Sequence, residues 1–221
     1  MSFEGTGQVT FLVQIKKFQE LLLDFINGEN NQNEIDKLIS DLISENNHFK
    51  IKEYLNMISN IANNHYRSTN FFSKIEHILI SLKDIIKQTF LNFELFKIFK
   101  ENKRILLFLL KQQFITIDKQ IALILSQNPY YDYFCYEILS YYKDGKINCK
   151  EDELEDFEKK RQIGENDKYI CKLIRDDSIV DFITYISKNE FSTNSIISPS
   201  KFETNSFLLS HSKTTLIQYA A

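Results

Sequence analysis

The sequence of 221 residues contains only five glycines and two prolines, and it has no tryptophan. Glycine and proline form the tight turns of β-hairpins, and glycine-rich loops bind phosphate groups. This composition therefore argues against an all-β fold and against a phosphate loop. The three cysteines, Cys135, Cys149 and Cys171, form no CxxC pair. An odd number of widely spaced cysteines predicts reduced, intracellular thiols rather than a disulfide framework.

Signals for secretion, membrane insertion and nucleic-acid binding are weak. The first seven residues lack the basic and apolar regions of a signal peptide. The longest strongly apolar run, Ile105 to Leu110, has six residues, whereas a bilayer requires about 20. The 27 basic and 30 acidic residues give a net charge of −3, which does not favour a nucleic-acid partner. We therefore expect a soluble, cytoplasmic protein.

Apolar residues recur at helical spacing along most of the chain. The stripes at 35–43, 51–62 and 75–86 have members three and four positions apart, and no segment alternates with the period of a strand. We predict that Asn33 caps one helix, that Ser73 forms a capping box with Glu76, and that Asp118 caps a helix over 121–125. Short connections leave neighbouring helices antiparallel. The predicted fold class is all-α, an array of antiparallel helix hairpins.

The composition changes after residue 150. Six of the eight residues from Glu151 to Glu158 are acidic, and three basic residues, ending at Arg161, follow at once. Contiguous charges of one sign usually remain in solvent. We predict a helical N-terminal domain at 1–150, an exposed charged connector or solvated helix at 151–168, and a second unit at 169–221. Within that unit, 191–213 is expected to be mostly loop.

No motif for catalysis, cofactor binding or metal binding stands out. The histidines are scattered and lack the convergent spacing of metal ligands. Cys171 lies on an apolar helical face, which favours a packed thiol over a nucleophile. We therefore expect no enzyme, and no cofactor, metal or small-molecule substrate.

Two surfaces remain as candidates for binding a macromolecule. Basic residues between Lys97 and Lys111 lie near several phenylalanines, as in a nucleic-acid-binding module, although Glu94 and Glu101 are interspersed. Tyrosines over 130–142 could anchor a protein partner, although packing between helices is their commoner role. The possible interface residues are Tyr130, Tyr131, Tyr133 and Tyr136.

Two longer stretches, 161–183 and 198–221, carry a family resemblance. The first begins Arg161-Gln-Ile-Gly-Glu-Asn and the second begins Ser198-Pro-Ser-Lys-Phe-Glu-Thr-Asn. Together they resemble the expanded ankyrin-repeat family of trichomonad parasites, whose members carry a helical N-terminal domain of unknown function before an ankyrin array. The resemblance extends over about residues 50–221.

The resemblance implies an ankyrin-like packing motif at the end of the chain. The ankyrin signature is T-P-L-H-x-A. Thr215, Ile217 and Ala220 match its Thr, Leu and Ala, and Ala220 with Ala221 would allow close helix packing. Leu216 replaces the Pro and Gln218 replaces the His, and these departures are expected to weaken the turn and its hydrogen bonds.

The resemblance also implies how the chain is organised and used. Residues 169–189 would form an earlier, degenerate repeat, whose second helix would be lined by Ile179, Val180, Phe182, Ile183 and Ile186. The chain stops inside a following repeat, so we expect either the N-terminal capping portion of a protein–protein interaction scaffold or the product of a gene truncated by a shifted frame. The alternative is the helical nucleic-acid-binding module of residues Lys97 to Lys111.

Overall fold

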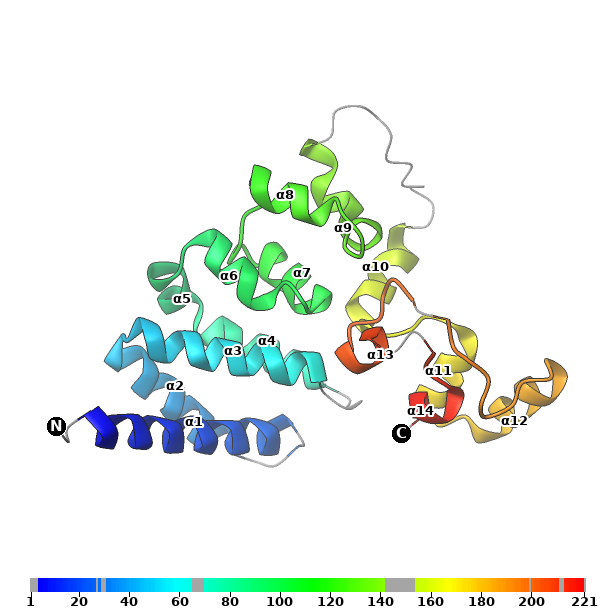
Figure 1. The fold of residues 1–221 in the computed structure, drawn as a ribbon, viewed down its shortest axis with the longest axis horizontal. Coiled ribbons are helices and arrows are strands. Elements are labelled where there is room, and N and C mark those ends of the chain that lie inside the picture. Colours follow the sequence, from blue (N-terminus) through cyan, green and yellow to red (C-terminus); the bar gives the residue numbers. More distant parts are fainter. Residues whose placement is uncertain are drawn as a thin grey trace. The chain divides into compact units, whose positions relative to one another are not determined.

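The computed structural model describes residues 4–26, 28, 31–64, 70–141, 154–198, 200–210 and 213–220 (Figure 1). Every regular element in these residues is a helix, and a single isolated antiparallel bridge joins Ile196 to Thr215. The all-α prediction is therefore confirmed. The chain divides into two compact units, one of residues 1–99 with 111–115 and the other of residues 100–110 with 116–221.

The first unit contains six helices among its described residues. The order is α1 (Glu4–Ile26), α2 (Gln32–Glu45), α3 (His48–Asn64), α4 (Phe71–Ser81), α5 (Lys83–Thr89) and α6 (Asn92–Phe99). Its core follows the predicted stripes, because Ile35, Ile51 and Ile75 are completely buried. Phe18 of α1 meets Tyr54 of α3 edge to face at 4.5 Å.

The predicted starts of two helices in this unit are wrong. Helix α2 begins at Gln32, with Asn31 rather than Asn33 at its N-cap, and α4 begins after Asn70, whose backbone is left-handed. Ser73 lies inside α4 and donates its hydroxyl hydrogen to the carbonyl oxygen of Asn70. Several asparagines and serines near each start compete for the cap, so their spacing alone does not select one.

The second unit contains the remaining helices. They are α7 (Lys103–Lys111), α8 (Lys119–Leu125), α9 (Tyr131–Ile138), the 3-10 helix η1 (Leu139–Tyr141), α10 (Leu154–Ile163), α11 (Tyr169–Arg175), α12 (Ile179–Lys188), α13 (Ser206–Ser210) and α14 (Leu216–Ala220). The cap predicted at Asp118 is confirmed, because its carboxylate accepts the Ile121 N–H at 2.9 Å. The segment 191–213 is mostly loop among its described residues, apart from α13.

The division into units differs from the predicted boundaries at residues 150 and 168. Residues 116–141 belong to the same unit as 169–220, and two hydrogen bonds between Tyr133 of α9 and Arg161 of α10 join these parts of the chain. The Tyr133 hydroxyl donates to the Arg161 carbonyl oxygen at 2.9 Å, and the Arg161 guanidinium donates to the Tyr133 carbonyl oxygen at 2.8 Å. The predicted exposed connector is therefore wrong at Arg161, which is only 1% exposed.

The buried charge of Arg161 is balanced locally. Its guanidinium pairs with Glu137 at 2.8 Å and with Glu158, and it lies over the ring of Phe157 at 4.9 Å. Burial alone disfavours the charged form, but hydrogen bonds and attraction from the two carboxylates outweigh it and raise the pKa of Arg161. The residues from 142 to 153, which include the first part of the acidic run, lie outside the described residues.

Replacing Arg161 is expected to unfold the second unit more readily. The substitution Arg161→Met keeps an apolar stem beside Phe157 but removes the cation facing two partly buried carboxylates, so we expect a loss of about 3 kcal/mol in the free energy of unfolding. Urea unfolding followed by circular dichroism measures the change. The control is Lys159→Met on the same helix, whose exposed ion pair with Glu155 should contribute less than about 1 kcal/mol. Equal effects of the two substitutions would contradict this account of Arg161.

Candidate functional site

The two stretches that carry the family resemblance lie together in the second unit and share a buried carboxylate. Glu203, which is 4% exposed, accepts the backbone N–H groups of Thr204 at 2.9 Å, Asn205 at 2.8 Å and Asn166 at 3.2 Å. Charge-assisted hydrogen bonds to backbone N–H groups are among the stronger ones in proteins. One carboxylate therefore fastens the loop after α10 to the segment before α13.

A glycine allows the two segments to approach. The Thr204 hydroxyl donates to the Gly164 carbonyl oxygen at 2.7 Å, and the Thr204 N–H donates to the same oxygen at 3.1 Å. Gly164 ends α10 in a left-handed conformation with φ of +72°, and a Cβ atom placed there would lie 2.8 Å from Cδ of Arg104. Both the backbone angle and the contact therefore favour glycine.

Further polar contacts extend this junction to α11 and α14. Ser200 donates its hydroxyl hydrogen to Asp167 at 2.7 Å, and the Asn166 amide donates to the Ser198 carbonyl oxygen at 3.1 Å. Arg175, at the end of α11, pairs with Glu165 at 3.1 Å and donates to the Tyr219 hydroxyl of α14 at 3.0 Å. We call the contacts of residues 164–167 with 198–205 the Glu203 junction. A cavity of only about 20 Å³ remains beside it, enough for about one water molecule. The junction therefore holds the two segments together and leaves no room for a larger ligand.

Helix α14 begins with a reciprocal cap. The Thr215 N–H donates to the Gln218 side-chain oxygen at 2.9 Å, and the Gln218 N–H donates to the Thr215 hydroxyl at 3.3 Å. This is the capping-box arrangement, in which a threonine and a glutamine three positions later satisfy each other's backbone groups. The expectation that Gln218 weakens the turn is therefore wrong, because its side-chain oxygen accepts hydrogen bonds from the Thr215 backbone and hydroxyl.

The predicted packing motif uses different residues from those expected. Leu216 and Tyr219 of α14 are buried with Ile170 and Cys171 of α11, whereas Ile217 is 57% exposed. Ala220 is also exposed, and Ala221 lies outside the described residues. Helix α14 therefore packs through Leu216 and Tyr219, each of which directly precedes a residue of the signature, Ile217 or Ala220.

Helix α12 has an uncovered apolar side. Its half-buried residues Phe182 and Ile186 pack on the cluster that contains α11 and α14, and no residue of α12 is fully buried. Ile179 is 61% exposed, Val180 is 77% exposed and Ile183 is 54% exposed. These three residues were expected to line the helix pair, and they face solvent instead. We refer to Ile179, Val180 and Ile183 as the α12 face.

The tyrosines proposed as an interface are largely used inside the fold. Tyr133 is completely buried, which removes it as a contact residue for a partner. Tyr136 packs edge to face against Phe157 at 5.3 Å, and Tyr130 and Tyr131 are half-buried. Burial, with a smaller effect from Glu101, raises the pKa of Tyr130 to about 12.

The basic residues from Lys97 to Lys111 do not act as one exposed group. Lys103 is only 3% exposed, and Arg104 donates its Nε hydrogen to the Gln162 carbonyl oxygen. Lys100 pairs with Glu101 at 3.3 Å. A nucleic-acid site would need these side chains to reach phosphate groups, and Lys103 does not reach solvent.

Lys103 is a buried amine held by the C-terminal segment. Its Nζ donates to the Lys201 carbonyl oxygen at 2.7 Å and lies 5.3 Å from the centre of the Tyr133 ring. Burial lowers the pKa of Lys103 to about 8, and attraction from Glu203 and Asp132 offsets only part of that effect. The folded protein therefore loses this proton at a lower pH than the unfolded chain does.

Other candidate chemistry is not assembled in the described part of the chain. No three histidine, cysteine or acidic side chains there could hold a metal ion together. Cys135 and Cys171 are buried, and Cys149 lies outside the described residues. Among the helices described, none has the length and hydropathy needed to cross a membrane.

Comparisons with known proteins do not extend these observations. No protein-family model, curated protein or solved structure matches this chain. Sequence reasoning singled out both segments of the Glu203 junction but missed the roles of Gly164 and Glu203. The only signal for them was a glycine directly after a helix and an acidic residue beside threonine and asparagine.

The pH dependence of stability is expected to report on Lys103. Between pH 8 and about 10, the unfolded lysine keeps its proton while the folded one loses it, so the free energy of unfolding should rise with pH. We expect a gain of about 1–2 kcal/mol between pH 7.5 and 9.5 in urea titrations. Lys103→Met should flatten the rise, whereas an unchanged slope in the variant would contradict the assignment. The titration stays below pH 10, because Tyr130 and Tyr133 have raised pKa values and would then lower the stability.

Proposed function

We propose that this chain is the N-terminal capping portion of a non-enzymatic, ankyrin-type scaffold that binds other proteins. The observation that carries the proposal is the asymmetry at the end of the second unit. Helix α14 packs on α11 and begins with the Thr215–Gln218 capping box, while α12 keeps an uncovered apolar face.

Stacked repeats explain this asymmetry. An ankyrin unit is a pair of helices that buries its apolar side only against the pair in the next unit. Here α11 and α12 form one pair, joined by the turn at Asp176 and Asp177, and α14 takes the place of the first helix of a following pair. The second helix of that following pair would cover the α12 face.

The Glu203 junction supports a capping role for the preceding residues. It joins the loop between α10 and α11 to the segment before α13, and Arg175 of α11 donates to the Tyr219 hydroxyl of α14, so the first helix pair has a fixed partner on its N-terminal side. A repeat array requires a terminal element of this kind, because an uncovered apolar end exposes the array to aggregation. In this arrangement, protein partners would bind mainly to units that follow.

A fusion experiment tests the proposal. Two consensus ankyrin units are joined so that Thr215 to Ala220 form the start of the first added unit. We expect the fusion to unfold in one transition and at a higher urea concentration than residues 1–221 alone, because the added helices bury the α12 face. Circular dichroism and tyrosine fluorescence should report the same midpoint.

The double substitution V180E/I183E provides the matched comparison. Both side chains are exposed in residues 1–221, so the double variant should change the stability of this chain by less than about 0.5 kcal/mol. In the fusion it should separate the unfolding of the added units from that of the second unit. Independent unfolding of the unsubstituted fusion would contradict the stacking. Specific capture of a cellular protein by residues 1–221 with micromolar affinity or better would contradict the proposal that partners bind mainly to the units that follow.

A further inference from the structure

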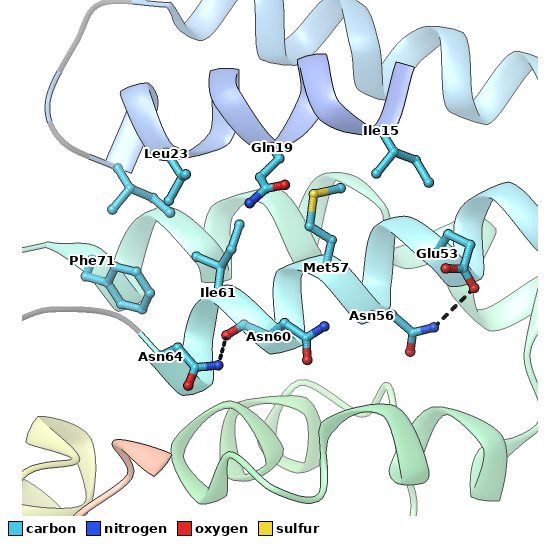
Figure 2. Close-up of a pocket in the computed structure, with 11 residues that line it drawn as sticks. Ile15, Gln19, Leu23, Glu53, Asn56, Met57, Asn60, Ile61, Asn64 and Phe71 are labelled. Atoms are coloured by element: carbon cyan, nitrogen blue, oxygen red, sulfur yellow. Dashed lines mark hydrogen bonds between the residues drawn. The ribbon is translucent and has the colours of Figure 1, made fainter. Parts of the chain in front are cut away.

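The first unit contains a groove between α1 and α3 that the proposed function does not use. It encloses about 480 Å³, which lies in the range of ligand-binding pockets. Figure 2 shows α1 along one side and α3 along the other. The lining consists of Ile15, Gln19, Leu23, Ile26, Glu53, Asn56, Met57, Asn60, Ile61, Asn64 and Phe71.

The apolar part of the groove is its floor. Ile26, Met57 and Phe71 are all less than 9% exposed, so they form a firmly packed surface. Leu23 and Ile61 are half-buried beside them. This surface can accept aliphatic side chains, and each one buried would contribute apolar contact area.

A row of side-chain amides follows one edge of this floor. Asn56, Asn60 and Asn64 lie on α3 at intervals of four residues, and Figure 2 shows them on the side of Met57 and Ile61 that faces away from α1. Gln19 of α1 lies across the groove from them. The side-chain amides of Gln19 and Asn60 make no hydrogen bond within the described part of the chain.

The spacing of the amides matches an extended chain. Residues four apart on an α-helix are separated by about 6 Å along its axis. Every second residue of an extended peptide is separated by about 6.6–6.8 Å. A primary amide both donates and accepts, as do the N–H and C=O groups of a peptide backbone. A bound helix would satisfy most of its backbone groups internally and would leave these amides little to bind.

The charge at one end of the groove favours a basic residue at the corresponding end of such a peptide. Glu53 is the only charged side chain among the described lining residues, and it lies at the end opposite Phe71 (Figure 2). One of its oxygens accepts the Asn56 amide hydrogen at 3.4 Å. A carboxylate at one end of a groove whose other described lining residues are uncharged favours a cationic group there.

We propose that the α1–α3 groove binds an extended peptide segment of another protein, with aliphatic residues at alternate positions and a lysine or arginine at the Glu53 end. The side-chain amides of Asn56 and Asn60, with Gln19 opposite them, hydrogen-bond the peptide backbone, and the floor accepts the aliphatic side chains. This site lies within the first unit and does not depend on the α12 face. Failure of either proposal would leave the other intact.

A defined peptide library tests this site on the full chain. The probe is a positional-scanning library of seven-residue peptides, acetylated at the N-terminus and amidated at the C-terminus, applied to immobilised residues 1–221. We expect enrichment of leucine, isoleucine or valine at alternate positions and of lysine or arginine near one end. N-methylation of the peptide nitrogens that face the asparagine row should weaken the best peptide at least tenfold.

Variants of the protein separate the contribution of the asparagine amides from that of the Glu53 carboxylate. The double substitution N56A/N60A should weaken the best peptide at least tenfold, and Glu53→Gln should remove the preference for a basic residue while leaving the aliphatic preference. Gln88→Ala, an exposed amide outside the lining, is the matched control and should leave binding unchanged. Thermal unfolding confirms that each variant is folded. The proposal is overturned by no enrichment, by apolar positions spaced three and four apart as in a helix, or by full affinity in the folded N56A/N60A protein.

Discussion

The buried carboxylate of Glu203 is the interaction on which the second unit depends. It accepts three backbone N–H groups from segments 37 residues apart in the chain. Those N–H groups belong to loops, which have no helix or strand to satisfy them, and a buried N–H group without a partner is costly. A single side chain thus replaces the secondary structure that would otherwise be needed to hold the loops together.

This constraint explains how short helices can be stable here. Helices α11 and α14 have seven and five residues, too few to be stable in isolation. Arg175 and Tyr219 join α11 to α14, and the Glu203 junction joins the loop before α11 to the segment before α13. Helices α11 and α14 are thus held in place, and α12 packs on them through Phe182 and Ile186. The α12 face remains in solvent, and the proposed repeat stacking would cover it.

Local patterns predicted the helices but not the buried polar groups. The stripe over 35–43 and the cap at Asp118 depend on neighbours within one or two turns, so both were readable from the sequence. The burial of Arg161 and Glu203 depends on segments that meet only in the folded chain, and their charges suggested exposure. The spacing of Asn56, Asn60 and Asn64 can be read from the sequence, but the groove that they border forms only because α1 packs beside α3.

Hydrogen exchange in the Glu203→Gln variant tests the central claim most directly. Glutamine keeps the size of the side chain, but it removes the charge and one of the two acceptor oxygens. We predict that amide exchange in α11 and α14 accelerates at least tenfold, while α3 in the first unit keeps its protection. Unchanged exchange in α11 and α14, with faster exchange only at Thr204 and Asn205, would show that the junction does not hold these helices in place.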